Sequence, residues 1–423
     1  MQKKIIALAI AGLVSGGAFA QTNVTISGEM KVGFEAVSAG GATVANSSQS
    51  SRNRVTDNNS KIKFAGEEKL NSGMTAWWQM ESAIGTSDNV GTTGAAGNGA
   101  PGTTTLGSRN TAVGLKGAWG NVFMGKWDAH YNTVAAVDTM GLADGHGLAT
   151  SSLSILHTNG AVATATVAVN NNNAATVAGR GAANGFGGRL NNVVAYVTPN
   201  WNGFAITFAH STQGESTLAG ISAKDKAWAV NPTYVNGPIS LFYGWMKLSN
   251  TGAAVTTPVA GETGNNLTGQ RLGGAYTFPM GLKIGLVWDK NKVDVADGTA
   301  SLGALGIAAT GTNIAAHARR ERTAWALPIQ YVTGAHKVNF TYASAGDVKT
   351  DIGTVGSSGA KMYVLGYEYS LSKRTSVAAS WTSINNGNNA AYDGWHPSSN
   401  VAQGALNAGA DPRILQMNLR HSF

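Results

Sequence analysis

The segment "RILQMNLRHSF" (Arg413–Phe423) decides the fold of this chain. Apolar Leu415, Met417 and Leu419 alternate with polar residues, which is the two-residue period of a β-strand with one apolar and one polar face. The alternation continues in step to the aromatic Phe423, where most soluble domains would have a frayed polar tail. We therefore expect this segment to be a strand that pairs with another strand along its whole length.

Composition narrows the class of protein. The 423 residues include 56 Gly, only 9 Pro and no Cys, and charged residues make up 12% of the chain. Abundant Gly without Pro excludes collagen and is typical of many tight turns and long loops. The formal net charge of +8 comes without a basic stretch interleaved with aromatic residues, so we expect no nucleic-acid partner.

Residues 1–20 have the features of a secretory signal peptide. A basic head, "MQKK", precedes the apolar run Ile5–Val14, and "AFA" (18–20) is a small-residue cleavage site. We therefore predict two parts, a signal peptide at 1–20 and one exported domain at 21–423. No later stretch reaches the roughly 18 apolar residues of a transmembrane helix, so no helical anchor is expected.

The two-residue period recurs along nearly the whole chain and comes in pairs. Seven predicted hairpins are joined by short turns: 61–70 with 74–83, 110–117 with 121–127, 190–199 with 204–211, 226–234 with 239–247, 270–278 with 282–290, 322–331 with 336–344, and 361–370 with 375–383. An opening strand, "VTISGEMKVGFEA" (24–36), and the closing segment bring the predicted number of strands to 16.

Three all-β architectures fit such a pattern: a soluble sandwich, a soluble eight-stranded barrel and a transmembrane barrel. The sandwich has no reason to keep every second connection short, and the soluble barrel would be roughly half this length. A transmembrane barrel has short turns at one rim and long loops at the other, and lipid tolerates no open strand edge. We therefore predict a 16-stranded antiparallel transmembrane β-barrel. Aromatic residues near strand ends fit its interfacial girdles: Trp127, Tyr196, Trp201, Tyr234, Trp288, Tyr331, Tyr369 and Trp381.

Several stretches resemble the trimeric general porins of Gram-negative outer membranes, in the betaproteobacterial and neisserial branch. They are "SKIKFAGEEKLNSGMTAWWQME" (60–81), "RNTAVGLKGAWGNVFMGK" (109–126), "LSKRT" (371–375) and "LRHSF" (419–423). The resemblance implies short periplasmic turns, long extracellular loops, and a long third loop folded into the lumen. It also implies a homotrimer in outer-membrane lipid, and a terminal aromatic, here Phe423, that the barrel-assembly machinery reads.

The resemblance also implies a pore constriction in which basic residues on the barrel wall face acids on the infolded loop. Carried over by position, the wall residues are Lys61, Arg109 and Arg189, and strand parity adds Lys63. Parity disagrees at Arg109, which faces lipid unless a bulge intervenes. The loop acids would be Asp128, Asp138 and Asp144.

The alternative interpretation is that each of these charged side chains only solvates a rim or a loop of the barrel. Other residues expected to face the wider lumen are Glu29, Lys31, Glu81, Arg271, Lys283, Arg322, Lys337 and Arg420. Because this set is mainly basic, we predict mild anion selectivity that weakens as salt screens the charges.

The predicted function is therefore a passive channel for ions and small hydrophilic solutes. Alternatives are a substrate-specific anion channel, although "ARRER" (318–322) is too short for an arginine ladder, and a plugged barrel acting as an adhesin or receptor. An outer-membrane enzyme is disfavoured, since no nucleophile motif frames the Ser and His residues. "DGHG" (144–147) lacks spaced partners for a metal, and we expect neither metal nor cofactor.

Overall fold

The structure is a computed structural model that describes residues 24–70, 73–86, 106–128, 130–132, 147–156, 189–215, 224–250, 265–295, 318–350, 353–394, 401 and 406–423. The helices in this part of the chain are one turn or less: η1 (His130–Asn132), η2 (Leu148–Thr150) and α2 (Leu153–Leu156). The strands are β1 (Thr25–Gly40), β2 (Gln49–Asp57), β3 (Lys61–Lys69), β4 (Thr75–Ala83), β5 (Thr111–Gly117), β6 (Gly120–Asp128), β7 (Arg189–Val197), β8 (Phe204–Glu215), β9 (Lys224–Asn236), β10 (Ile239–Asn250), β11 (Asn265–Thr277), β12 (Leu282–Val295), β13 (Ala318–Thr333), β14 (His336–Ala345), β15 (Val348–Thr350), β16 (Gly353–Val355), β17 (Ala360–Ser370), β18 (Thr375–Asn386) and β19 (Asp411–Ser422).

The nineteen strand segments form one antiparallel sheet that closes into a barrel of sixteen strands. β2 and β3 pair with successive halves of β1, so they are one barrel strand interrupted at residues 58–60. β15 and β16 pair with each other and extend the ladder of β14 and β17. β15 continues β14 alongside β13, and β16 continues into β17. Merging these three pairs of segments leaves sixteen strands, the predicted number.

β1 and β19 close the barrel. They pair along twelve residues of each strand, and Phe423 extends the ladder by exchanging two backbone hydrogen bonds with Gly28, of 3.0 and 3.1 Å. Among the strands that the structure describes, this pairing leaves no open edge to lipid, which could not satisfy the backbone groups of such an edge. The closing role predicted for the terminal segment is confirmed.

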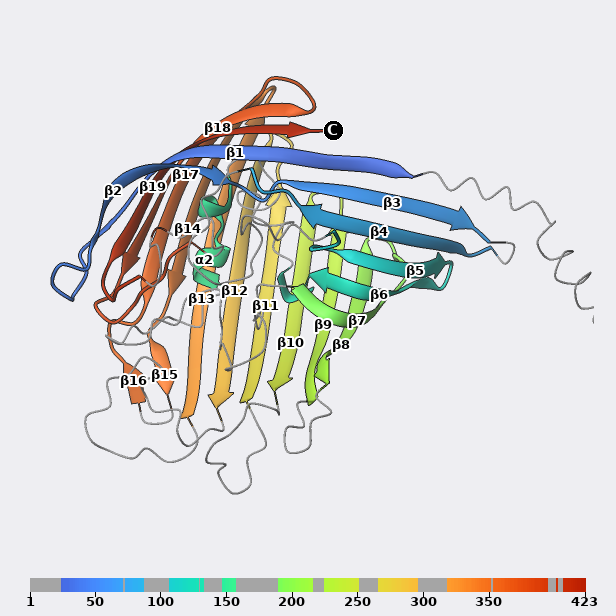
Figure 1. The fold of residues 1–423 in the computed structure, drawn as a ribbon, viewed down its shortest axis with the longest axis horizontal. Coiled ribbons are helices and arrows are strands. Elements are labelled where there is room, and N and C mark those ends of the chain that lie inside the picture. The colour runs from blue at the N-terminus through green and yellow to red at the C-terminus, as the bar shows by residue number, and fades with distance from the viewer. Residues whose placement is uncertain are drawn as a thin grey trace, which may run out of the picture.

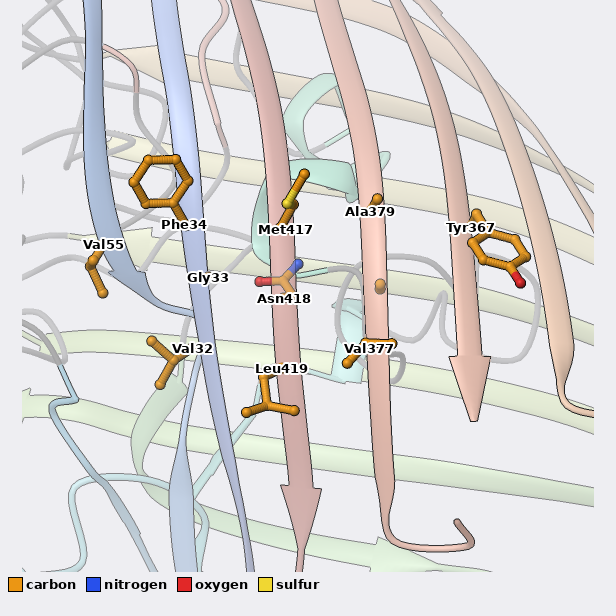
Figure 2. Close-up of a pocket in the computed structure, with 11 residues that line it drawn as sticks. Val32, Gly33, Phe34, Val55, Tyr367, Val377, Ala379, Met417, Asn418 and Leu419 are labelled. Carbon is orange, nitrogen blue, oxygen red and sulfur yellow. The ribbon is translucent and has the colours of Figure 1, made fainter. Parts of the chain in front are cut away.

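The strands alternate between an exposed outer face and a covered inner face. On β1, Ile26 and Phe34 are 58% and 53% exposed, whereas Glu29 and Lys31 are 5% and 1% exposed. Figure 2 shows the outer wall around the β1–β19 seam, where apolar side chains line a shallow groove: Val32, Phe34, Val55, Val377, Met417 and Leu419. Apolar outside and polar inside is the pattern of a transmembrane barrel and the reverse of a soluble sandwich.

All seven predicted hairpins are present. The backbone N–H of Ser422 donates to the carbonyl of Arg374 in the β17–β18 turn at 2.8 Å, so β19 ends at the rim of the short turns. Both sides of the β1–β19 seam therefore reach this rim.

The predicted aromatic girdle is mostly outward. Trp201, Trp288, Tyr331, Tyr369 and Trp381 are between 37% and 54% exposed on the outer surface.

Trp127 was wrongly assigned to that girdle. Its ring packs 4.7 Å from the ring of Phe123, which is 4% exposed, and 6.1 Å from that of Trp77. Trp127 lies four residues after Phe123 on β6, so strand alternation places both rings on the inner side.

The described parts of the connection between β6 and β7 lie within the ring of strands, as α2 does in Figure 1. η1 contacts β9, β10 and β11, η2 contacts β18, and α2 contacts β13, β14 and β17. A third loop folded into the lumen was predicted and is confirmed for these residues. Among the helices in the described ranges, none has the length and apolarity to cross a bilayer.

Candidate pore constriction

A band of charged side chains crosses the barrel wall from β19 to β7, and it begins at Glu29. Lys61 of β3 lies opposite Glu29 in the register, and its Nζ is 3.2 Å from Glu29 Oε1. Nε of Arg420 donates to Glu29 Oε2 at 3.0 Å. Lys31, two residues along β1, also interacts electrostatically with this carboxylate. The predicted wall residue Lys61 therefore belongs to a cluster of three cations around one acid.

The band continues across β4 to the segment before β5. Lys63 pairs with Glu81 in the register of β3 and β4, and Nε of Arg109 donates to Glu81 Oε1 at 2.6 Å. A second nitrogen of Arg109 donates to the side-chain oxygen of Asn59. Arg109 and Glu81 are 6% and 8% exposed, so this ion pair is nearly covered.

Arg109 reaches this position through a one-residue bulge at Asn110. Met80 pairs with Thr111, so an unbroken register would place Asn110 opposite Glu81. Instead, the backbone N–H of Arg109 donates to the carbonyl of Glu81 at 2.9 Å. The structure thus contains the bulge that strand parity required for an inward Arg109.

The last part of the band joins β6 and β7. Arg189 and Asp128 are register partners, and Nε of Arg189 lies 3.0 Å from Asp128 Oδ1. Asn110 bridges them, because its amide donates to Asp128 Oδ2 at 2.7 Å and its oxygen accepts from Arg189 at 3.1 Å. The prediction of Asp128 as an acid on the infolded loop is wrong, since β6 extends to this residue and places it on the wall. The other predicted loop acids, Asp138 and Asp144, lie outside the described residues.

The infolded loop is fixed to the wall by a buried polar network around Asp289 of β12. The Tyr131 hydroxyl donates to Asp289 Oδ2, and Arg271 binds the same oxygen at 3.0 Å. Arg322 donates to Asp289 Oδ1 at 2.8 Å and to the carbonyl of Leu156 at 2.6 Å. Both described halves of the loop, η1 and α2, are therefore held at one point of the wall.

This network changes the meaning of two predicted lumen charges. Arg271 and Arg322 are 0% and 2% exposed. The Arg271 guanidinium lies 4.4 Å from the centre of the Tyr131 ring and also donates to the Tyr131 carbonyl at 3.2 Å. Both guanidinium groups are therefore structural supports for the loop and are covered from the solution in the pore.

The loop has a second contact with the wall at the β1–β19 seam. Gly147 has a φ of +84°, and a Cβ on it would lie 2.6 Å from the side-chain oxygens of both Asn58 and Gln416. Asn58 in turn donates to Asn418 at 2.7 Å. Only glycine combines this backbone conformation with such a close approach.

His130 lies at the root of the loop, next to the Phe123 ring at a centroid distance of 6.4 Å. Burial lowers the pKa of the His130 imidazole to about 4, against the opposing effect of the Asp128 carboxylate. The imidazole is therefore neutral at pH 7 and adds no charge to the band.

Sequence reasoning missed Tyr131 and Asp289. The available signal was Asp289 in "VWDK", a carboxylate in mid-strand whose neighbour Trp288 faces outward, which marks an inward acid. In the described part of the chain, no three His, Asp or Glu side chains come together as a metal site would require.

A family described as Gram-negative porin matches residues 7–389. The major outer membrane protein P.IB of Neisseria meningitidis serogroup B is 33% identical over 129 residues, which are 30% of this chain and 34% of that protein. The protein of the same name from Neisseria sicca is 33% identical over 131 residues. The chain thus matches about a third of the length of these relatives.

Solved structures resemble the chain over nearly its full length. An anion-selective porin from Comamonas acidovorans superposes with a TM-score of 0.67 at 20% identity, covering 95% of this chain and 100% of that one. The trimer form of OmpT from Vibrio cholerae gives 0.59 at 14% identity, covering 95% and 99%. At these identities the likeness establishes the fold alone.

Proposed function

The chain belongs to the Gram-negative porin family and is an outer-membrane β-barrel, and on that premise we propose that it is a passive diffusion channel for ions and small hydrophilic solutes. The observation that carries the proposal is the charged band on the wall. In this band the side chains of Lys61, Arg420 and Asp128 are 29%, 27% and 44% exposed. Charges that remain wet inside a barrel serve ion passage better than they serve a packed core.

We further propose that the channel favours anions mildly. The band contains six bases, Lys31, Lys61, Lys63, Arg109, Arg189 and Arg420, against three acids, Glu29, Glu81 and Asp128. Lys31 is 1% exposed, and without it five bases remain against the three acids. The structurally similar porin from Comamonas acidovorans is anion-selective, which supports a preference for anions here. Lys61, Lys63, Arg109 and Arg189 are the wall of the proposed constriction, with Asp138 and Asp144 as acids on the facing loop.

The proposal includes a homotrimer. The apolar groove on β1, β2 and β17–β19 (Figure 2) offers a surface for a neighbouring subunit, and a trimer form exists for the structurally similar OmpT of Vibrio cholerae. Phe423 serves as the assembly signal during insertion, before its backbone pairs with Gly28.

Swelling of liposomes that contain the purified protein tests the channel function. Neutral sugars of increasing size should enter at rates that fall smoothly with size and do not saturate with concentration. Saturable entry of one anion would instead favour the substrate-specific channel. No entry of any solute through correctly folded protein would contradict the proposal and favour the plugged barrel.

A further inference from the structure

We propose that Glu29 is a selectivity-determining residue, whose carboxylate is a resident counter-ion on a site that would otherwise bind a small oxyanion such as phosphate. The inference rests on the proposed channel function and extends it. It concerns an acid of the wall, whereas the family resemblance assigns the wall only bases.

The register gathers the charges of this site on one patch of the inner wall. Glu29 and Lys31 are two residues apart on β1 and so share a face. Lys61 lies opposite Glu29 on one side of β1, and Arg420 lies opposite Lys31 on the other. The four side chains therefore come from three neighbouring strands, with three positive charges and one negative charge.

Lys61 and Arg420 contact different oxygens of the Glu29 carboxylate. Lys61 Nζ approaches Oε1 at 3.2 Å, and Arg420 Nε donates to Oε2 at 3.0 Å. The two donors converge on one carboxylate-sized group, which is also the geometry that binds a carboxylate or phosphate ligand. Glu29 thus has the position and the charge of a bound anion.

Burial determines which of these groups the pore solution reaches. The Glu29 side chain is 7% exposed, whereas the side chains of Lys61 and Arg420 are 29% and 27% exposed. A passing anion can therefore meet the two cations, but their shared partner cancels part of their charge at close range. Removing the carboxylate charge would leave three cations at the same patch, and the donors of two of them, Lys61 and Arg420, converge on one point.

Variants of similar shape test this inference in planar bilayers. Glu29→Gln keeps the volume of the side chain and removes its charge, and Glu29→Asp keeps the charge. The matched control is Glu368→Gln: Glu368 is also inward and near the short-turn rim, and it forms an ion pair with Lys337 at 3.2 Å, on β14 and β17 rather than on the strands of the Glu29 site. Each variant is measured for the anion-to-cation permeability ratio and for block of chloride current by inorganic phosphate.

We expect Glu29→Gln to raise the permeability ratio by about twofold or more in 0.1 M salt, and the gain should shrink in 1 M salt, where the screening length is only about 3 Å. Phosphate block should appear or strengthen in this variant. Glu29→Asp should stay close to wild type, and Glu368→Gln should give a smaller rise without phosphate block.

A ratio unchanged in Glu29→Gln, or a rise and block equal to those of Glu368→Gln, would overturn the inference. If Glu29→Gln does not fold, Arg420→Gln provides the opposite test: it should lower the ratio, and an unchanged ratio would count against the site. A wild-type protein that forms no channels would instead refute the proposed function, so the two failures are distinguishable.

Discussion

At the scale of single residues, the inner wall is governed by pairing of charges. Each acid of the band lies about 3 Å from a base, and such a pair acts on a distant ion as a dipole. In salt of physiological strength the screening length is about 8 Å, so only the surplus of bases near the ion's path contributes to selectivity. This explains why we expect a mild preference from a chain with a formal charge of +8.

Gly28 lies against the terminal aromatic ring. A Cβ on Gly28 would lie 2.6 Å from a ring carbon of Phe423 and 2.5 Å from the backbone oxygen of Lys61. Gly28→Ala should therefore strain the β1–β19 seam by about 1–3 kcal/mol and lower the temperature at which the folded barrel unfolds on a semi-native gel. Gly40→Ala on the same strand, where nothing lies within 4 Å, is the control and should unfold as wild type does. Equal unfolding temperatures for the two variants would refute the close packing of the Phe423 ring against Gly28.

At the scale of elements, the infolded loop depends on Asp289. This carboxylate is 0% exposed and holds Arg271, Arg322 and the Tyr131 hydroxyl. Asp289→Asn would remove the carboxylate charge that both buried guanidinium groups contact, and breaking such a buried pair typically costs about 3–5 kcal/mol. We expect a loosened loop, seen as more frequent brief closures in single-channel records.

The control for Asp289→Asn is Glu321→Gln. Glu321 pairs with Lys290 across β12 and β13 at 2.9 Å, on the same two strands, but both side chains are partly exposed. It should leave the closures at the wild-type frequency. A wild-type frequency of brief closures in Asp289→Asn would show that other contacts hold the loop in place.

The root of the same loop should respond to acid through His130. Because the pKa in the docked loop is about 4, below the ordinary value of 6.5, the docked state binds fewer protons than an undocked one. Neutral His130 therefore contributes its full share to the stability of the docked loop above pH 6.5, and this contribution is lost as the pH falls from 6.5 towards 4. Closures should become more frequent over this range, and His130→Gln should lose that part of the response. An identical pH response in both proteins would exclude His130 as its origin.

Sequence patterns predicted the regular elements and missed their interruptions. Alternation alone located the seven hairpins, because one face of each strand must be apolar. The break between β2 and β3 depends on local contacts, such as the Ser60 N–H donating to Asp57 at 3.0 Å and the left-handed Asn59 at φ 75°. "DNNS" (57–60) carries turn-forming residues and could have indicated this break.

At the scale of the whole molecule, closure brings together charges that no local pattern could pair. Glu29 and Arg420 are 391 positions apart, and they meet only because β1 and β19 are neighbours. The sequence therefore predicted which residues are charged and inward on most strands. It could not predict that Arg271 and Arg322 bind Asp289 and the infolded loop, since those contacts depend on the path of the loop inside the barrel.

The central claim is that the paired band leaves a positive surplus facing the pore. The most direct test is the reversal potential of the wild-type channel in a planar bilayer across a KCl gradient, repeated at low and high mean salt. The account predicts a potential of the sign for chloride preference, small in size and declining as salt increases. A clear potassium preference at low salt would contradict it, because the acids of the pore would then outweigh the bases of the band.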